Sequence, residues 1–238
     1  MSDVSFERQD DVALITLSRA ERRNALDPQM LAELDAHLIE FDQASELRAA
    51  VIRGAGPVFC AGAKRETGEV PQEPKRSHGN GPGLAQLVVN LRENKPVIAA
   101  VHGYAIGGGV RILLHCDLVL AGRSTLFRVP EILLGLEVRP LWELIRARAN
   151  TGFADDVCLT GRYWTAEEAH AAGVVQKVVE DADVFQASLE AAAELGALPA
   201  NALNELVGAK REILRKVESG VEHIPRRRDS SANTNGGN

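Results

Sequence analysis

The amino-acid sequence predicts an α/β fold in which short buried strands alternate with amphipathic helices. The first observation behind this prediction is a pair of apolar runs, at residues 49–53 and 97–106, that each lead into a glycine-rich turn. Runs of this length suit buried strands and are too short to span a membrane. The second observation is a helical period of apolar side chains, clearest at Met30, Leu34 and Leu38.

Composition limits the class of protein. The chain has 238 residues, of which 45% are hydrophobic and 25% are charged, so it can bury one large core with a small appendage. A formal charge of -6 gives no support for nucleic-acid binding. Its three cysteines have no metal-ligand spacing. Because no secretory leader and no membrane-spanning run is visible, we expect a cytoplasmic protein that binds neither nucleic acid nor a membrane.

The N-terminal third reads as a hairpin, a helix and a strand. Residues 4–8 and 12–17 form the hairpin around two aspartates. Asp27 is a typical N-cap and Pro28 suits the first helical position, so a helix runs from there to about residue 44. A strand at 49–53 follows. Residues 64–83 are rich in glycine, proline and charge and are expected to form a mobile loop, with a helix at 84–93 after it.

The centre of the chain carries a second strand and turn. Pro96 suits the first position of a strand, because proline cannot donate to the ladder. The apolar run after it ends in Gly107, Gly108 and Gly109, and a buried helix follows at 110–116. A glycine-rich turn lets a ligand approach the backbone and leaves the first helical N–H groups unpaired. Together with the turn at 55–63, it could hold one oxygen atom between two backbone donors.

The C-terminal half is predicted to continue the alternation of strands and helices. Thr165 and Glu168 form a capping box for a helix that stops at Gly173. A polar tail at 226–238 is expected to be disordered. The other predicted elements are strands at 117–121, 125–129 and 174–179, a helical turn at 131–134, and helices at 141–149, 153–159, 183–195 and 200–217.

Four motifs in order resemble the enoyl-CoA hydratase/isomerase (crotonase) family. They are ERRNAL at 21–26, FCAGA at 59–63, KPVIAAVHGYAIGGG at 95–109 and PEILLG at 130–135. The resemblance extends from about Phe6 to Val179. It implies a crotonase-like spiral of repeated β-β-α units over residues 1–180, a C-terminal helical oligomerisation segment at 181–225, and the disordered tail at 226–238. It also implies a homotrimer or a dimer of trimers.

The resemblance also implies the chemistry of the site. The substrate is an acyl-CoA, whose coenzyme A is part of the substrate, and no further cofactor or metal is expected. The backbone N–H groups of Ala63 and Gly108 correspond to the family's donors to the thioester oxygen, and Glu131 corresponds to a catalytic carboxylate. The alternatives are glycines that serve only packing and a carboxylate that only caps a helix. The matching substrate-binding positions are Arg23, Ala25, Ala61, Lys64, Gly107 and Arg111.

Arg111 marks a departure from the family pattern, because it stands where the family places a first carboxylate. The one remaining glutamate can still move a double bond, so we expect an isomerase rather than a hydratase. A third hypothesis is a non-catalytic acyl-CoA-binding protein. Arg111 could pair with Glu131, bind a substrate carboxylate or face solvent. Glu137 is a candidate second carboxylate or a plain surface charge. The loop at 64–83 is either a lid over the acyl pocket or a surface insertion.

Two histidines, His102 and His115, flank the central helix of the motif. Each is expected to be a packed or hydrogen-bonded residue rather than a catalyst. Lys64 replaces an acidic residue that the family usually has at this position, and its cation could help to hold a phosphate of coenzyme A.

Overall fold

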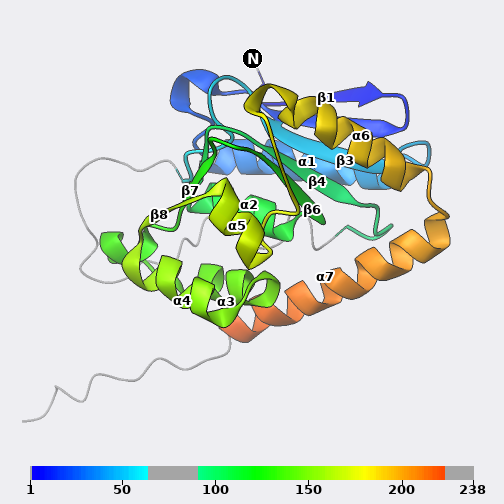
Figure 1. Cartoon of the computed structure of the whole chain (residues 1–238). Helices are drawn as coiled ribbons and strands as arrows, with labels where there is room; N and C mark the ends of the chain where they lie inside the picture. Colours follow the sequence, from blue (N-terminus) through cyan, green and yellow to red (C-terminus); the bar gives the residue numbers. More distant parts are fainter. Residues whose placement is uncertain (1, 64–90, 223–238) are drawn as a thin grey trace, which may run out of the picture.

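The computed structural model describes residues 2–63 and 91–222, and within these ranges it confirms the α/β fold (Figure 1). Six strands form one sheet in the order β1-β2-β3-β4-β6-β9. All neighbours in it are parallel except β1 and β2, which form the predicted antiparallel hairpin. The strands are β1 (Val4–Gln9), β2 (Val12–Leu17), β3 (Ala49–Gly54), β4 (Val97–Val101), β6 (Leu118–Gly122) and β9 (Lys177–Val179).

Both faces of this sheet are covered, as expected for strands that are apolar on both sides. On one face, alternate strand residues such as Val51 and Ile98 pack with α6 (Val184–Gly196). On the other face, Ile52 and Ala99 belong to the larger core, which includes α1 (Pro28–Gln43) and α2 (Gly108–His115). Because the strands are parallel, the loops that follow β3 and β4 leave the same edge of the sheet.

A second, three-stranded sheet corrects the prediction that residues 97–106 form one strand. The chain leaves the large sheet after Val101 and turns at Gly103, whose φ is +64°. A side chain at Gly103 would collide with the carbonyl oxygen of Pro57. The chain then enters the small sheet of order β5-β7-β8, formed by β5 (Tyr104–Ile106), β7 (Leu126–Arg128) and β8 (Tyr163–Thr165).

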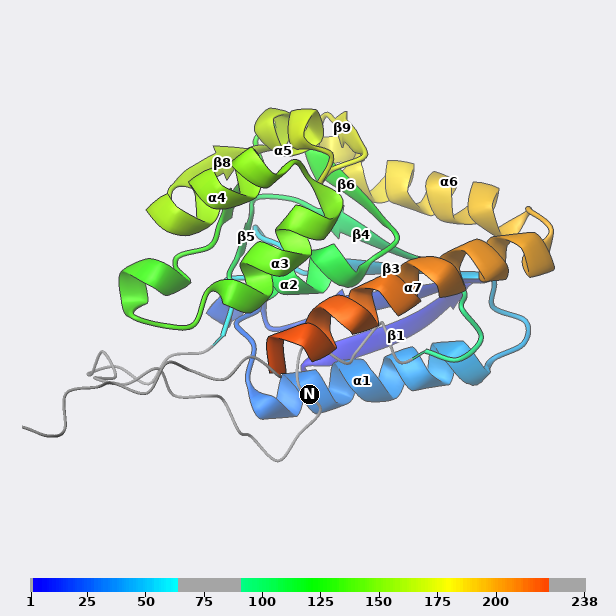
Figure 2. The ribbon, with the colours of Figure 1, turned by 90° about the horizontal axis from the view of Figure 1, so that it is seen from below.

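The remaining helices pack around the two sheets, and Figure 2 shows α7 running past α2 and α3 on the side of α1. The capping box of Thr165 and Glu168 is confirmed, with both reciprocal hydrogen bonds formed. The elements are α3 (Arg139–Arg148), α4 (Thr151–Thr160), α5 (Ala166–Ala172), α7 (Ala200–Glu222), and the 3₁₀ turns η1 (Ala20–Arg22), η2 (Glu131–Leu134) and η3 (Asp181–Asp183).

Some predicted elements differ or lie outside the described residues. The strand predicted at 174–179 begins only at Lys177, and β8 was not anticipated. Residues 91–93 of the helix predicted at 84–93 are not helical, and the rest of that segment lies outside the described residues. The predicted loop at 64–83 and the tail at 226–238 lie outside them as well.

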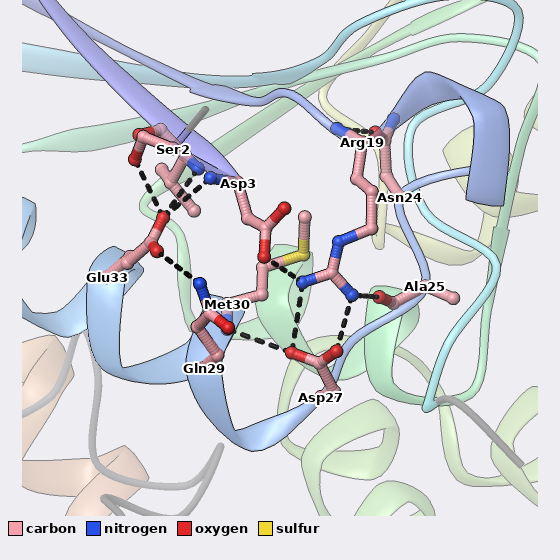
Figure 3. Close-up of polar contacts among 10 residues, drawn as sticks. Ser2, Asp3, Arg19, Asn24, Ala25, Asp27, Gln29, Met30 and Glu33 are labelled. Carbon is pink, nitrogen blue, oxygen red and sulfur yellow. Dashed lines mark hydrogen bonds and ion pairs between the residues drawn. The ribbon is translucent and has the colours of Figure 1, made fainter. Parts of the chain in front are cut away.

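Arg19 ties the start of the chain to the first helix (Figure 3). Its guanidinium is buried and pairs with the carboxylates of Asp3 and Asp27, with 2.5 Å between Nη1 and the Asp27 Oδ2. Asp27 also accepts a 3.0 Å hydrogen bond from the backbone N–H of Met30, as the predicted N-cap of α1. One charged cluster therefore fixes the loop that runs from β2 to α1.

Asn24 connects this loop to the turn that follows β3. Its side chain is fully buried; Oδ1 accepts from the backbone N–H of Arg19 at 3.0 Å. Its Nδ2 donates to the carbonyl oxygens of Ala55 and Val58 at 2.9 Å each, and of Phe59 at 3.1 Å. The φ of Asn24 is +53°, a conformation that asparagine tolerates better than most residues. Asn24 therefore holds the first glycine-rich turn in shape.

We predict that Asn24→Ala lowers the free energy of unfolding by about 2–4 kcal/mol, because several buried backbone groups lose their partner at once. Urea unfolding followed by circular dichroism measures the change. The control is Gln186→Ala on the exposed face of α6, which should change stability by less than about 0.5 kcal/mol. A loss below about 1 kcal/mol for Asn24→Ala would show that the turn does not depend on this side chain.

Candidate active site

The two glycine-rich turns meet beside the small sheet. The segment after β3 runs along β5: Cys60 forms a parallel bridge with Ala105, and the Ile106 N–H donates to the Cys60 carbonyl at 3.0 Å. A Cβ placed on Gly62 would lie 2.6 Å from the Ile106 oxygen and 3.5 Å from the Gly108 nitrogen. The backbone of residues 62–63 therefore lies against the start of α2, with no side chain between them.

The two predicted backbone donors lie on this contact. Gly108 is the first residue of α2, so its N–H has no acceptor within the helix. Within residues 2–63 and 91–222, neither the N–H of Gly108 nor that of Ala63 donates a hydrogen bond. Ala63 is exposed and Gly108 is half-buried, so small residues leave the backbone open. Two unused donors near each other can bind one oxygen that gains negative charge.

Glu131 brings a carboxylate to the same place. It begins η2, and a Cβ placed on Gly107 would lie 2.5 Å from Glu131 Oε1. Its Oε2 is buried and has no hydrogen-bond partner among the described residues. Burial raises the pKa of Glu131 above its ordinary value, while a hydrogen bond from its own backbone N–H and the positive charge of Arg111 act in the opposite direction. A desolvated carboxylate with one oxygen left without a hydrogen bond is suited to accept a proton.

Three of the predicted substrate-binding positions, Arg23, Ala25 and Ala61, lie beside the segment that leads to Ala63. The Ala61 N–H donates to the carbonyl of Arg23 at 3.0 Å, and the Leu26 N–H donates to the carbonyl of Gly62 at 2.7 Å. These bonds place Ala25, between Arg23 and Leu26, next to the residues that precede Ala63. Gly107 contacts Glu131, as described above. Lys64 lies outside the described residues.

Arg111 is neither paired with Glu131 nor facing solvent alone, which were two of the predicted alternatives. Its guanidinium donates to the carboxylate of Glu218 on α7, with 2.6 Å from Nη2 to Oε2 and 3.3 Å from Nε to Oε1. It is therefore paired, but with a residue that the sequence analysis did not select. Glu137, the candidate second carboxylate, is exposed. Glu218 lies 107 positions after Arg111, and no sequence spacing could have identified it.

The histidines are hydrogen-bonded, as predicted. His102 Nε2 lies 2.8 Å from the Gly56 carbonyl oxygen. His115 is buried, with Nδ1 at 2.8 Å from the Arg111 carbonyl oxygen and Nε2 at 3.0 Å from Glu218 Oε1. The cysteines are buried free thiols. In the described ranges, no group of three or more His, Cys, Asp and Glu side chains could hold a metal ion, and no helix is long and apolar enough to cross a membrane.

Two backbone donors and one buried carboxylate lie at a loop edge of a parallel sheet. This arrangement defines a class of enzyme that polarises a carbonyl group and moves a neighbouring proton. Residues 7–226 match the family described as enoyl-CoA hydratase/isomerase. The chain belongs to this family, and the predicted crotonase-like fold and enzyme class are confirmed.

Individual relatives agree with this assignment. The chain is 33% identical to the mevalonyl-coenzyme A hydratase of Aspergillus fumigatus, over 76% of this chain and 67% of that protein. It is also 33% identical to an enoyl-CoA hydratase of Mycobacterium tuberculosis, over 88% of this chain and 80% of that protein. The crystal structure of an enoyl-CoA hydratase/isomerase from Pseudoalteromonas atlantica superposes with a TM-score of 0.78 at 28% identity, covering 92% and 89% of the two chains.

We predict that Glu131→Gln stabilises the protein at pH 7. The pKa of this carboxyl is raised in the folded state, so the folded protein binds the proton more tightly than the unfolded chain. The free energy of unfolding therefore falls as pH rises from the unfolded pKa, about 4.3, through the folded pKa. The variant escapes this loss, so its advantage in Tm should be present at pH 7 and vanish toward pH 4.

Thermal unfolding from pH 4 to pH 8 measures this difference. The control is Glu190→Gln on α6, which removes one carboxylate from an exposed position. A Tm difference between wild type and Glu131→Gln that stays constant with pH would show that the Glu131 carboxyl titrates alike in the folded and unfolded chains.

Proposed function

We propose that this enzyme binds an enoyl-CoA thioester, stabilises its enolate and shifts its double bond, with Glu131 as the single acid and base. The observation that carries the proposal is the Glu131 carboxylate, buried against Gly107, with Arg111 as the charged side chain that acts on it. Of the two other carboxylates considered, Glu137 is exposed and Glu218 is paired with Arg111.

The backbone donors supply the electrostatic part of the reaction. The thioester oxygen accepts hydrogen bonds from the N–H groups of Ala63 and Gly108 and gains negative charge as the α-proton leaves. The N-terminus of α2, which begins at Gly108, adds a favourable dipole. Removal of one such donor typically costs about 3 kcal/mol of transition-state stabilisation.

The carboxylate of Glu131 supplies the proton transfer. It takes a proton from the α-carbon of a 3-enoyl-CoA, and the electron pair of that C–H bond forms the carbon–carbon double bond of an enolate while the carbonyl π pair moves onto the thioester oxygen. When the carbonyl re-forms, the enolate double bond shifts to the α,β position, and the electron pair of the former β,γ double bond takes the proton back from Glu131 at the γ-carbon. One group performs both steps, and its raised pKa makes it a stronger base for the first step.

Hydration is a second candidate reaction, favoured by the names of the relatives. The proteins from A. fumigatus and M. tuberculosis are both described as hydratases. In this reaction Glu131 would activate a water molecule that adds to the β-carbon of a 2-enoyl-CoA, and the proton would go to the α-carbon. The homotrimer or dimer of trimers and the cytoplasmic location remain part of the proposal.

We predict that the protein converts 3-enoyl-CoA to the conjugated 2-enoyl-CoA, and that Glu131→Gln lowers kcat by about 10²–10⁴-fold, the usual contribution of a general acid–base. Absorbance of the conjugated thioester measures the reaction, with Glu190→Gln as the control. Loss of the conjugated absorbance from added 2-enoyl-CoA, without formation from 3-enoyl-CoA, would instead establish a hydratase. Binding of CoA esters without either reaction would establish a non-catalytic protein.

We also predict that Gly107→Ala lowers kcat by about 10²-fold and, because Gly107 is also a predicted substrate-binding position, weakens the binding of a CoA ester. The new Cβ would meet Glu131 Oε1 at 2.5 Å and displace the carboxylate, and the φ of +51° at Gly107 would strain the backbone of an alanine. A displacement of this size is enough for a large loss of rate. Steady-state kinetics and CoA-ester binding measure the two effects. Unchanged kcat would mean that the carboxylate does not act from beside Gly107.

A further inference from the structure

Arg111 lies in the first turn of α2, close in sequence to the proposed site. Its backbone N–H donates to the carbonyl of Gly107 at 3.0 Å, so Arg111 stands one helical turn after the residue that contacts Glu131. Residues four positions apart lie above one another on a helix. A cation at this position opposes the raised pKa of Glu131, and it weakens that base further if it approaches more closely.

The guanidinium is nevertheless turned toward α7. Both oxygens of the Glu218 carboxylate accept hydrogen bonds from Arg111, which is the bidentate geometry that fixes direction as well as distance. His115 Nε2 lies 3.0 Å from the same carboxylate, and His115 Nδ1 lies 2.8 Å from the carbonyl of Arg111. Glu218 is 12% exposed and Arg111 is 22% exposed, so solvent screens this pair only in part.

We propose that Glu218 is a positioning residue of the active site: it holds the Arg111 guanidinium against α7 and away from the Glu131 carboxylate. The role rests on the proposed function, because it matters only where Glu131 acts as a base. The last turns of α7 are then part of the site, although they lie far along the chain from the glycine-rich turns.

Among residues 2–63 and 91–222, few other ionisable groups act on Glu131 and Glu218. Glu131 is faced by Arg111 from α2 and by the thiol of Cys158 from α4. Burial raises the pKa of Cys158 to about 12, so this thiol stays neutral. Glu218 is faced by Arg111 and His115, both from α2. The Arg111 guanidinium is therefore the charge whose distance from Glu131 depends on the orientation of its side chain.

Other contacts hold the rest of α7 against the main body of the protein. Lys210 Nζ lies 3.1 Å from Asp117 Oδ1, and the buried guanidinium of Arg211 donates to the Lys95 carbonyl at 2.5 Å. Leu214 is buried in the main core. Glu218→Gln removes the charge and keeps the size of the side chain, so the variant is expected to fold with α7 in place.

The test measures the ionisation of Glu131 directly in the full chain. Carbon-13 NMR of labelled glutamate carboxyls, assigned with Glu131→Gln, follows the titration without any substrate. In Glu218→Gln we expect the midpoint of Glu131 to move to lower pH, because Arg111 has lost its counter-charge. In the double variant Arg111→Gln, Glu218→Gln, the midpoint should return to the wild-type value or above it. The control Glu212→Gln removes an exposed carboxylate from α7 and should leave it unchanged.

Enzyme kinetics provide the second readout. The acid limb of kcat/KM should move in the same direction as the NMR midpoint, and the plateau rate of Glu218→Gln should fall by roughly 3- to 30-fold, as a weaker base requires. If Glu218→Gln lowers Tm but leaves the titration midpoint of Glu131 unchanged, Glu218 has only a structural role and the proposal is wrong. A shifted midpoint in a protein that turns over neither enoyl-CoA would keep the positioning role and refute the proposed reaction.

Discussion

The site depends on one close approach of two backbone segments. The segment after β3 and the segment after β4 can touch only because no side chain stands at their contact: a Cβ on Gly62 would meet the carbonyl of Ile106 at 2.6 Å. With any larger residue at this point, the N–H groups of Ala63 and Gly108 would be pushed apart. The parallel order of β3 and β4 brings the two segments to the same edge, and the fully buried Asn24 side chain fixes the shape of the first. Fold and chemistry are therefore set by the same contact.

The second constraint is electrostatic. A buried carboxylate oxygen without a partner, such as Glu131 Oε2, is unfavourable for the folded state. The same desolvation makes the group a stronger base, so stability is given up where reactivity is gained. Two other charged groups of the described chain have charged partners. Arg19 lies between two carboxylates, and the carboxylate of Asp117 accepts from the Val97 N–H and from Lys210. The unpartnered, desolvated oxygen of Glu131 supports the proposed role of this carboxylate as acid and base.

Local signals explain what the sequence could predict. Asp27 followed by Pro28, and Thr165 followed by Glu168, act within one helical turn, and both caps are confirmed. The family motifs placed Ala63, Gly108 and Glu131 in the candidate site, and the structure brings their segments together. The small sheet was missed because strands of three residues carry no period, and their pairing joins β5, β7 and β8 from distant parts of the chain. The Glu218 partner of Arg111 was missed for the same reason: its position is set by how α7 packs, not by any nearby residue.

The charge at position 111 has consequences for the number of proton-transfer groups in the site. A carboxylate at this point of α2 would give Glu131 a neighbour of the same sign and a second group able to handle water. An arginine at this point gives Glu131 a neighbour of opposite charge. Without a partner of its own, this arginine would make Glu131 a weaker base. The ion pair with Glu218 gives the guanidinium an acceptor on another helix. Under the proposed function, Arg111 on α2 and Glu218 on α7 act together: they leave Glu131 as the one carboxylate that moves a proton between two carbons.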